Sequence, residues 1–559
     1  MPRSKSFLVV AAFDFGTTYS GYAYSYTDDK TQVCTNQNWY SGGASSKLVS
    51  LKTPTSVLLG DKGQFHSFGF EAEDHFAMLA EDQLHTGWRL FRRFKMMLHT
   101  TKALARHTTV EDIEGKSYPA MDIFALAIKY LHGHLLDTFQ QRIPDMTETD
   151  IRYIITVPAI WDIGAKQFMR EAAVKAGIDG ERLEMAYESE VATIWCSGLN
   201  YGNASKAMER PSKYMVIDLG GGTADVSIIQ KLPDNHVKVV HKASGGAWGG
   251  IYVDQKFLIF LDSVLGKGSL EELRTFHMQD YFELIREFEH KKRSNTFHTS
   301  KVCIIRLPFS LMEIARKRNA ASGDSGNRES DKLRINQSDV KTWFSEPVSS
   351  LIDHIKDFRK FDTVNDVNTV LLVGGFAEST YVQERLRNEL PGITLIVPED
   401  AGLAVLKGAV LFGHNPSIVA SRVMSHTYGV SANDPNDENK HKPEVTFFYE
   451  NKWYARNCFN IFVKANEEIS VDHEIVRSFK VHSKHSRCQV YRTMSDKPEY
   501  TTEPGCELIG ILEINSTDSV TLTDQSIEVH FMFGHTELLI EVTNLHTGKK
   551  QTLLLDCLK

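Results

Sequence analysis

Residues 214–229 read YMVIDLGGGTADVSII, and residues 7–26 contain the related pattern FLVVAAF, DFGTTYSG and YAYSY. In both stretches an apolar run leads to an aspartate, a turn rich in glycine and threonine follows, and a second strand-like run begins. The two aspartates, Asp14 and Asp218, are 218 − 14 = 204 residues apart. A strand-turn-strand unit repeated at that distance predicts a duplicated fold of two lobes.

Both turns have the composition of a phosphate-binding site. Glycines let backbone N–H groups approach phosphate oxygens, successive N–H groups form an anion-binding concavity, and threonines add hydroxyl donors. Asp14 and Asp218 are expected to hold a hydrated Mg²⁺, which prefers carboxylates, waters and phosphates. The turn residues concerned are Gly16, Thr17, Thr18, Gly220, Gly221, Gly222 and Thr223.

One such turn alone would be interpreted as an ordinary glycine hairpin, because Gly and Thr turns are common. The second copy and a third glycine turn, Gly374-Gly375, favour phosphate binding. Two other phosphate motifs are excluded. Gly16 and Gly21 have P-loop spacing, but Tyr22-Ala23 stands where that motif needs Lys and Ser or Thr, and no G-x-G-x-x-G opens a helix.

Outside the repeats the pattern alternates between helices and short strands. Asp162 is expected to cap a helix that Gly177 closes. Residues 319–331 are polar and aperiodic, which predicts a flexible loop. We predict mainly helical structure over 80–135, 252–294 and 339–360, and strands over 151–157 (IRYIITV) and 369–376 (TVLLVGGF, with its glycine turn).

From about residue 417 short apolar alternations appear, such as Phe459-Ile461-Val463 and Ile527-Val529-Phe531-Phe533. With turn residues between them, they favour an antiparallel β-sandwich. The predicted division is an α/β part over 1–417 (lobe I about 7–210, lobe II about 211–413), a linker over 418–430 and a β-sandwich over 431–559.

Composition excludes several classes of protein. The 559 residues carry a net charge of 63 − 71 = −8, which argues against a general nucleic-acid binder. No apolar run reaches the roughly 20 residues of a membrane-spanning helix. Seven cysteines without a CxxC pair favour reduced thiols over a disulfide framework or a zinc ribbon.

Two local features have simple interpretations. The basic residues before FLVVAAF imitate a signal peptide, but the run ends at Asp14 with no small-x-small cleavage site, so a buried strand is favoured. The pairs His132/His134 and His482/His485 lack further ligands, and are expected to be surface histidines rather than metal ligands.

These segments resemble the motifs of a known family. FDFGTTYSGYAYS, VIDLGGGTADVSI and VLLVGGFAES are similar to the two phosphate motifs and the adenosine motif of the heat shock 70 kDa chaperone family, one of the actin-like ATPases. ITVPAIWD and PEDAGLAVLKGAV resemble its connecting and closing segments. The resemblance is strong over 7–413 and weaker over 455–556, which looks like the family's peptide-binding β-domain. The chain looks most like the heat shock 70 kDa protein 12 branch.

The resemblance implies a ribonuclease H-like nucleotide-binding domain that holds ATP or ADP with Mg²⁺. Asp14 and Asp218 match aspartates that bind the metal through water, and Glu188 matches a glutamate of the same network. Asp218 or Glu188 would orient the attacking water, in chemistry that is mostly positioning and charge neutralisation. The other matches to nucleotide contacts are Thr17, Thr18, Gly221, Gly222, Thr223, Gly249 and Gly250, and on the adenosine side Glu289, Lys292, Arg293, Gly374, Gly375 and Phe376.

Some of these matches have plain structural alternatives. Residues 289–293 could be only the solvated face of a helix. Glu188 could be a surface carboxylate, although its apolar neighbours favour the cleft.

The chain also departs from the family's pattern. LFRRFKMMLH offers Lys95 as the catalytic lysine, but one position out of register, and Arg92 or Arg93 would substitute imperfectly because a guanidinium is bulky and planar. The family's Asn-Glu-Pro is Tyr187-Glu188-Ser189 here. The linker has no carboxylate and few large aliphatic residues, and the chain stops at Lys559 without the family's helical lid. These differences predict weak coupling between nucleotide and peptide, less than about tenfold in affinity.

The predicted function is that of an ATP-binding, chaperone-like protein with slow hydrolysis. A lidless β-domain would bind an extended peptide or a specific protein, with co-chaperones as further partners. We expect neither nucleic-acid binding nor insertion into a membrane. We expect a monomer in the cytoplasm or the nucleus. The alternatives are a nucleotide-gated adaptor with negligible hydrolysis, and a small-molecule kinase on the same actin-like core.

Overall fold

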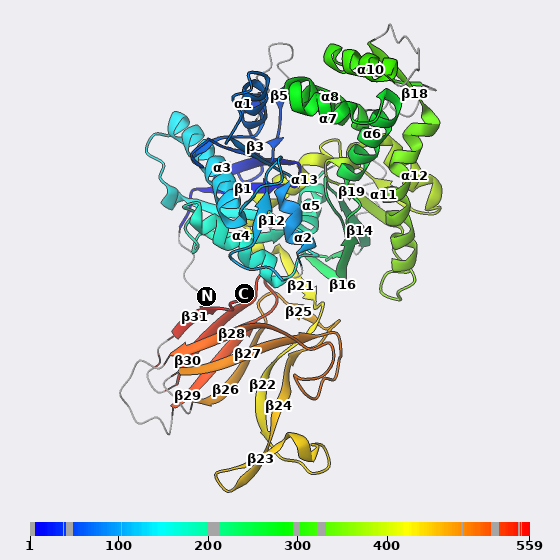
Figure 1. Ribbon diagram of the computed structural model, residues 1–559. Coiled ribbons are helices and arrows are strands. Elements are labelled where there is room, and N and C mark those ends of the chain that lie inside the picture. Colours follow the sequence, from blue (N-terminus) through cyan, green and yellow to red (C-terminus); the bar gives the residue numbers. More distant parts are fainter. Residues whose placement is uncertain are drawn as a thin grey trace.

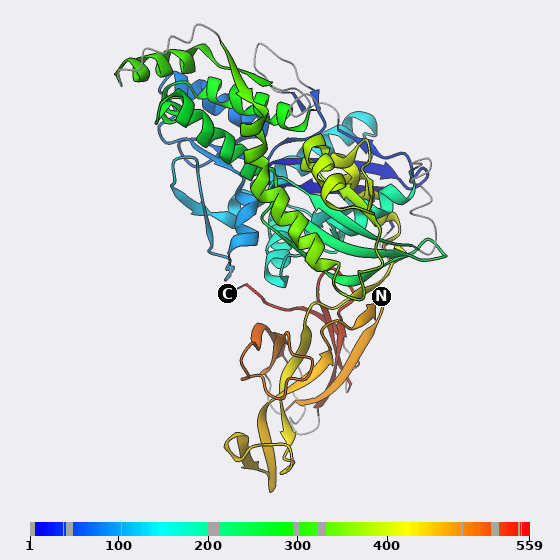
Figure 2. The ribbon, with the colours of Figure 1, turned by 90° about the vertical axis from the view of Figure 1, so that its right-hand side faces the viewer.

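The computed structural model describes residues 6–36, 39–40, 49–101, 103–199, 212–294, 302–321, 331–481, 485–515, 525–545, 548 and 550–558. A large α/β part lies above a smaller all-β part in Figure 1, and the turned view in Figure 2 shows the same two parts. No helix in this described part of the chain is both long and apolar enough to cross a membrane.

Lobe I is built on a mixed sheet with the strand order β13-β12-β1-β2-β3. Every residue of its central strand β1 (Val9–Phe15) is buried, which confirms a buried strand at this position. β1 pairs antiparallel with β2 and parallel with β12, so Asp14 lies near the carboxyl end of the central strand. The strands of lobe I are β1, β2 (Tyr19–Tyr26), β3 (Cys34–Thr35), β4 (Trp39–Tyr40), β5 (Val49–Ser50), β6 (Thr53–Pro54), β7 (Ser56–Leu59), β8 (Phe65–Phe68), β9 (Arg89–Arg92), β10 (Thr109–Glu111), β11 (Ser117–Pro119), β12 (Ile151–Val157) and β13 (Leu183–Tyr187).

Lobe II repeats this arrangement in the sheet β20-β19-β14-β15-β16-β21-β25. β14 pairs antiparallel with β15 and parallel with β19, as β1 does with β2 and β12. The predicted strand-turn-strand repeat is therefore confirmed, and Asp218 on β14 occupies the position that Asp14 has on β1. The strands are β14 (Ser212–Leu219), β15 (Ala224–Lys231), β16 (Val237–Gly246), β17 (Val302–Arg306), β18 (Lys332–Asn336), β19 (Thr369–Val373) and β20 (Thr394–Ile396).

Helices cover both sheets, and α5 and α13 lie between them. Apolar side chains of both lobes meet there in one core that includes Val10 and Val191 from lobe I and Val216 and Val373 from lobe II. The helices are α1 (Phe70–Glu81), α2 (Met97–Thr100), α3 (Ala120–Arg142), α4 (Ile163–Lys175), α5 (Glu188–Ser197), α6 (Gly250–Leu265), α7 (Ser269–Phe276), α8 (Met278–Arg293), α10 (Phe309–Ala321), α11 (Gln337–Phe358), α12 (Thr380–Glu389) and α13 (Ala404–His414).

The all-β part consists of two antiparallel sheets, β23-β24-β22-β27-β28 and β26-β29-β30-β31. Buried side chains of both sheets share one core, to which Val430 and Val490 contribute from the first sheet and Val529, Phe531 and Ile540 from the second. The strands of these two sheets are β22 (Thr427–Pro435), β23 (Thr446–Tyr449), β24 (Lys452–Val463), β26 (Glu474–Val481), β27 (His485–Thr493), β28 (Glu507–Asn515), β29 (Gln525–Met532), β30 (Leu539–Asn544) and β31 (Lys550–Leu554). Two short strands of the same region, β21 (Val419–Val423) and β25 (Glu468–Ser470), belong instead to the sheet of lobe II.

Residues 418–430, predicted as a linker, contain β21 and the start of β22. β21 pairs with β16 of lobe II, and Arg422 within it is buried and donates to both carboxylate oxygens of Glu190 at 2.7 Å. A bidentate pair of this kind is a strong, directional contact. The segment is thus held by backbone pairing and charge rather than by large aliphatic side chains.

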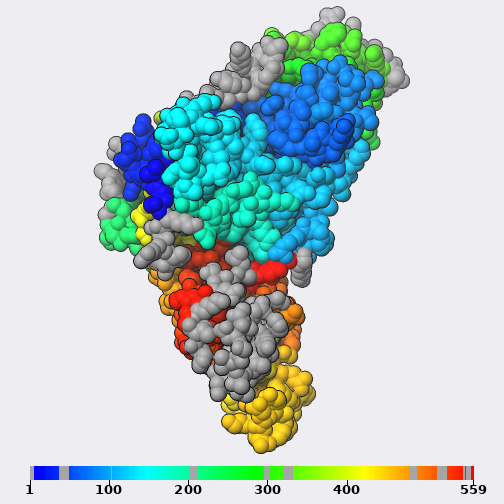
Figure 3. Space-filling view, turned by 90° about the vertical axis from the view of Figure 1, so that its left-hand side faces the viewer, coloured from blue at the N-terminus to red at the C-terminus, as the bar shows by residue number. Residues whose placement is uncertain are grey.

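The chain's last described residues pack on lobe I. Arg106 pairs with Asp556 at 2.8 Å, and Leu558 is buried in the apolar core of lobe I. Arg170 of α4 also pairs with Glu537, its Nε lying 2.6 Å from Oε1. Figure 3 shows the red C-terminal residues lying against the cyan and green surface of lobe I.

Five local predictions can be compared with these elements. The strand at 151–157 and the helices at 252–294 and 339–360 are confirmed, and Asp162 caps α4 by accepting from the Ala165 N–H at 2.8 Å. The prediction of mainly helical structure over 80–135 is wrong for its first part, which holds β9, α2, β10 and β11. Gly87 and Gly115 there adopt φ of 89° and 82°, which suits turns and not a helix interior.

The surface-histidine prediction is wrong for His132. This residue lies on the inner face of α3 and its Nε2 is 3.0 Å from the Tyr153 hydroxyl, while His134 Nδ1 is 2.8 Å from the Tyr22 hydroxyl. The His482/His485 pair and most of the predicted loop at 319–331 lie outside the described residues. Residues up to 321 belong to α10.

Candidate functional site

A cavity of about 600 Å³ lies between the lobes, and every predicted site residue except Gly249 lines it. Its floor is formed by the turns after β1 and β14 and the glycine turn after β19. Three glycine-containing turns therefore approach one another from both halves of the repeat. We call this space the nucleotide cavity hereafter for the ligand that its residues predict.

Gly374 and Gly249 explain why the turns need glycine. Gly374 has φ of 95°, and a Cβ there would lie 2.4 Å from Oδ1 of Asp218. Gly249 sits outside the cavity wall, where its N–H donates to the Gly222 carbonyl at 3.1 Å and a Cβ would lie 2.4 Å from the Gly221 oxygen. Gly249 thus lets the start of α6 pack onto the second turn, and positions that turn rather than contacting the cavity.

The carboxylates of the site are buried close together. Burial, and then the nearby charges of Glu188, Asp225 and Asp14, hold the pKa of Asp218 well above its usual range. Burial raises the pKa of Glu188 in spite of Lys95, and burial and Glu188 raise that of Asp225 to about 7. Negative charge at this end of the cavity is therefore undercompensated by the protein's own cations.

Two lysines enter the same region. Lys95 is buried, with Nζ 3.1 Å from Oε1 of Glu188, and so lies inside the cavity despite the register shift seen in the sequence. Lys52 was not predicted; its Nζ is 2.6 Å from Oδ2 of Asp14 and donates to the Gly402 carbonyl at 2.7 Å. Lys52 thereby contacts both Asp14 of lobe I and the backbone of lobe II.

The opposite end of the cavity gathers the predicted adenosine residues. Glu289 pairs with Lys292 and Arg293, whose charges outweigh the effect of burial and lower its pKa. The Arg293 guanidinium lies 5.5 Å from the centre of the Tyr19 ring and its Nη1 is 3.4 Å from Glu378. Residues 289–293 are therefore not merely a solvated helix face. A flat cation held beside an aromatic ring can stack on a planar base.

Lys292 is engaged more fully than the sequence suggested. Its ammonium lies 2.6 Å from Oδ1 of Asp254 and 5.8 Å from the centre of the Phe376 ring. The lobes also meet above the cavity, where Glu73 of α1 accepts from Arg92 at 2.8 Å and from Arg286 of α8 at 3.1 Å. These contacts close the end of the cavity that lies between α1 and α8, which run side by side at the top of Figure 1.

Sequence reasoning missed several lining residues. Tyr19, Trp161 and Glu378 stand inside motifs that were recognised, so their position in those motifs was a usable signal. Met96 directly follows Lys95 in LFRRFKMMLH, whereas Lys52 stands in no recognised motif. Among the described residues, no three His, Cys, Asp or Glu side chains lie close enough to ligate a metal ion directly.

Comparison with known proteins assigns this arrangement to a family. The sequence model of the Hsp70 protein family matches residues 13–542, which is most of the chain and includes every residue of the cavity named above. The chain belongs to the Hsp70 family. Proteins of this family have a two-lobed actin-like ATPase fold, which agrees with the two repeated sheets, and they generally bind ATP or ADP with Mg²⁺.

Individual Hsp70-family relatives share the whole length of this chain. It is 31% identical over 627 aligned residues to heat shock 70 kDa protein 12A of Mus musculus and to that of Homo sapiens. It is 29% identical over 634 aligned residues to heat shock 70 kDa protein 12B of Homo sapiens. In each case the alignment covers 100% of this chain and 92% of the relative. The predicted resemblance to the heat shock 70 kDa protein 12 branch is thus confirmed.

Proposed function

We propose that this chain binds Mg-ATP and Mg-ADP between its lobes, hydrolyses ATP slowly, and uses its all-β part to hold an extended peptide or a protein. The observation that carries the proposal is the convergence of the predicted phosphate, carboxylate and adenosine residues on one cavity of about 600 Å³. That volume is within the ordinary range of small-molecule sites.

The residues present fit a magnesium nucleotide. Asp14 and Asp218 would hold the ion through water, because burial and then the neighbouring carboxylates raise the pKa of Asp218, and a divalent cation would offset both effects. When bound, Mg²⁺ would supply positive charge that neutralises negative charge developing on the phosphates. Thr17, Thr18 and the backbone of Gly221 would donate to the phosphates.

Glu188 and Lys95 are the residues we assign to hydrolysis. Glu188 is buried, and its raised pKa suits a carboxylate that orients a water molecule and accepts its proton. Lys95 lies 3.1 Å from Glu188, so its ammonium would stand near the terminal phosphate and stabilise charge there. Arg293, Tyr19 and Phe376 would flank the base.

One observation favours the adaptor alternative. Lys52 already neutralises Asp14 at 2.6 Å, so an incoming Mg²⁺ has to compete with an ammonium for that carboxylate. A chain in which Lys52 won this competition would bind nucleotide with little hydrolysis, and nucleotide would then only set its conformation. The small-molecule kinase alternative has no comparable observation in its favour.

The all-β part would act as a β-sandwich, over about residues 431–559. The tip of its β23–β24 hairpin presents Phe448, Tyr449 and Trp453, each more than half exposed. Exposed aromatic clusters of this kind are typical of interaction sites. We propose that an extended peptide, a protein or a co-chaperone docks on this part, in a cytoplasmic or nuclear monomer.

Calorimetric titration of the full chain with ATP and ADP, with and without Mg²⁺, tests the proposal together with an assay of phosphate release. Mg-dependent binding with slow release supports the ATPase. Binding without release above a heat-denatured control supports the adaptor. No binding of either nucleotide contradicts both. Phosphate transfer to a panel of sugars would instead support the kinase.

The β-part is tested separately, by the anisotropy of a labelled apolar peptide under each nucleotide. We expect ATP and ADP to change peptide affinity by less than about tenfold. A much larger change would show strong coupling through the strand-paired β21.

A further inference from the structure

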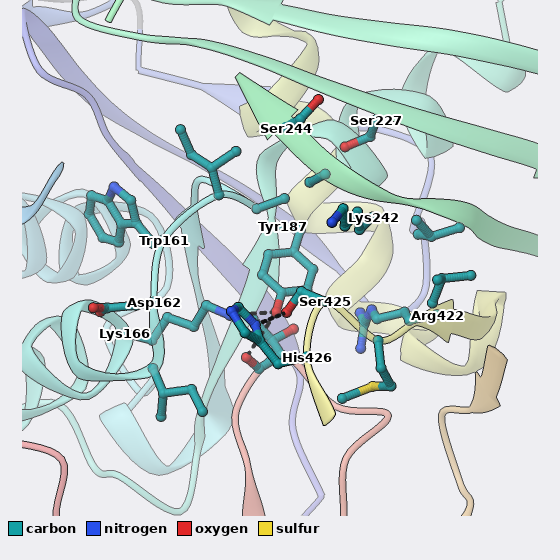
Figure 4. A pocket seen from close by; sticks show the side chains of 18 of the residues that line it. Trp161, Asp162, Lys166, Tyr187, Ser227, Lys242, Ser244, Arg422, Ser425 and His426 are labelled. Atoms are coloured by element: carbon teal, nitrogen blue, oxygen red, sulfur yellow. Dashed lines mark hydrogen bonds between the residues drawn. The ribbon is translucent and has the colours of Figure 1, made fainter. Parts of the chain in front are cut away.

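A second cavity, of about 610 Å³, lies where the lobes meet the all-β part; we call it the interdomain cavity. Lobe I contributes Ala159–Ile163 and Lys166, lobe II contributes Lys242–Gly245 of β16, and the β-part contributes Phe533 and residues 535–538. Trp161 and His99 also line the nucleotide cavity, so only a thin wall separates the two spaces. Figure 4 shows this cavity from close by.

Cations outnumber anions among the charged groups that line it. Arg422 is matched by Glu190, Arg492 pairs with Glu507 at 2.9 Å, and Glu537 pairs with Arg170. Asp162 caps α4 through its Oδ1 and keeps its charge, so the lining holds four cations, Lys166, Lys242, Arg422 and Arg492, against three carboxylates. No carboxylate in the described part of the chain lies within ion-pair distance of Lys166 or Lys242, which are the two ammonium groups left over.

Lys166 is the informative member of this pair, because it is only 7% exposed. Its Nζ donates to the Tyr187 hydroxyl at 2.6 Å, and Tyr187 in turn donates to the Thr536 carbonyl at 3.2 Å. An ammonium has three donors, so two remain. A buried charge without a counter-charge is costly, and an arriving anion would remove that cost.

Other lining groups supply donors without adding charge. Burial lowers the pKa of His426 to about 4, and burial also lowers the pKa of His99 and His354, so these rings are neutral at pH 7. The Trp161 Nε1–H is buried and has no acceptor among the described residues. In Figure 4, Lys166, Tyr187, Ser425 and His426 lie close together near the centre of the view.

The remaining wall of the interdomain cavity is largely apolar. The cavity thus combines one polar corner with an apolar wall against which a hydrocarbon group can be buried from water. This combination is usual in small-molecule sites. The cavity's apolar lining residues include Ile160, Trp161, Ile163, Met424, Met494 and Phe533.

We propose that the interdomain cavity is a second ligand site, distinct from the nucleotide cavity, for a small molecule that carries one carboxylate or phosphate group on an apolar body. The anionic group binds Lys166 and Lys242, and the apolar body packs against Trp161 and Phe533. Because the cavity is walled by all three parts of the chain, a bound ligand holds the β-part against the lobes.

Three matched probes test this on the full chain: 2-naphthoate, 2-naphthyl phosphate and the neutral 2-naphthamide. Binding is followed by ligand-observed NMR, with and without saturating Mg-ATP. We expect at least one anion to bind at least about tenfold more tightly than the amide, the size of a charged hydrogen bond. Whichever anion binds more tightly identifies the natural head group as carboxylate or phosphate.

Lys166→Met should weaken anion binding by about tenfold or more, and Lys242→Gln should weaken it to a smaller extent. The control is Lys175→Met, an exposed lysine on the same helix. If Lys166→Met fails to fold, anion binding by Lys242→Gln tests the proposal instead. Equal binding of the amide, unchanged binding in the tested variant, or displacement by Mg-ATP would each overturn the proposal. The last result would place the probe in the nucleotide cavity.

The test is independent of ATP hydrolysis. A chain that binds no nucleotide but retains anion binding through Lys166 would contradict the proposed function and leave this site intact.

Discussion

The nucleotide cavity and the interdomain cavity are of nearly equal size, about 600 and 610 Å³, and share Trp161 as a wall, yet they have opposite electrostatic character. Buried carboxylates dominate one end of the first, and unpaired ammonium groups dominate the second. The first is therefore suited to a cation that carries phosphates, and the second to a bare anion. Volume alone would not distinguish them; the balance of buried charges does.

The two cavities also differ in how the chain builds them. Backbone turns after β1, β14 and β19 form the floor of the nucleotide cavity. Side chains from α4, β16 and the β-part form the walls of the interdomain cavity. A substitution outside the shared residues Trp161 and His99 should therefore disturb one cavity without disturbing the other.

The largest expected effect concerns the buried carboxylates whose ion pairs hold together the elements around each cavity. Glu73 holds Arg92 and Arg286 above the nucleotide cavity, and Glu190 holds Arg422 beside the interdomain cavity. Because removing either leaves an arginine unpaired, Glu73→Ala and Glu190→Ala should each lower the free energy of unfolding by about 3 kcal/mol in urea denaturation. Loss of stability in neither variant would show that these pairs do not fasten the cavities.

The ion pairs of Glu73 also predict that the stability of the fold depends on pH. Although burial opposes it, Arg92 and Arg286 lower the pKa of Glu73 from its ordinary value of 4.5. Ionised Glu73 therefore stabilises the folded state above about pH 4.5, and this stabilisation is lost as the pH falls through the lowered pKa. Glu73→Gln should lack that part of the acid transition, and an unchanged acid transition would contradict the assignment.

The next largest effect is on catalysis. Glu188→Gln should slow phosphate release about 100-fold and change ATP affinity little, because the carboxylate acts on the water and not on the bound nucleotide. Single-turnover release measures the rate, and Glu184→Gln on β13, outside the cavity, is the matched control. Release at the parent rate in Glu188→Gln would remove Glu188 from the mechanism.

Lys52→Met tests the competition for Asp14. Without the ammonium, Mg²⁺ meets a free carboxylate, so the Mg²⁺ concentration for half-maximal ATP binding should fall by up to about tenfold. Exposed Lys62→Met is the control. An unchanged or increased requirement for Mg²⁺ would mean that Lys52 does not compete with the metal.

The smallest effect contrasts the two buried lysines. Lys95→Met leaves Glu188 without its cation and should lower the free energy of unfolding. Lys166→Met removes an ammonium that has no carboxylate, so stability should be unchanged or rise by about 1 kcal/mol. Chemical denaturation compares the two. A clear loss of stability in Lys166→Met would mean that its charge is already compensated.

The contrast also explains what the sequence could predict. The nucleotide cavity was predictable because its residues lie in short motifs that recur 204 residues apart, and the strands that carry them fix their positions. Even Lys95, one position out of register, was a usable candidate because the short 3₁₀ turn Phe94–Met96 carries it into the cavity.

Contacts between distant segments were not predictable. Lys52 reaches Asp14 only because β2 and β6 pair in lobe I, and Arg422 meets Glu190 only because β21 joins the sheet of lobe II. The interdomain cavity is made entirely of such contacts. Local periodicity also failed for residues 82–119, where glycines with positive φ break the chain into short strands.

The most direct measurement is calorimetric titration of ATP, with and without Mg²⁺, into the parent, Asp14→Asn and Asp218→Asn. Both aspartates reach the cavity from equivalent strands of the repeat, and Asn keeps their shape while removing the charge. We predict that Mg²⁺ tightens ATP binding by the parent, and that each variant loses most of this gain and stays folded. If both variants bind Mg-ATP as the parent does, the cavity between the lobes is not the magnesium nucleotide site.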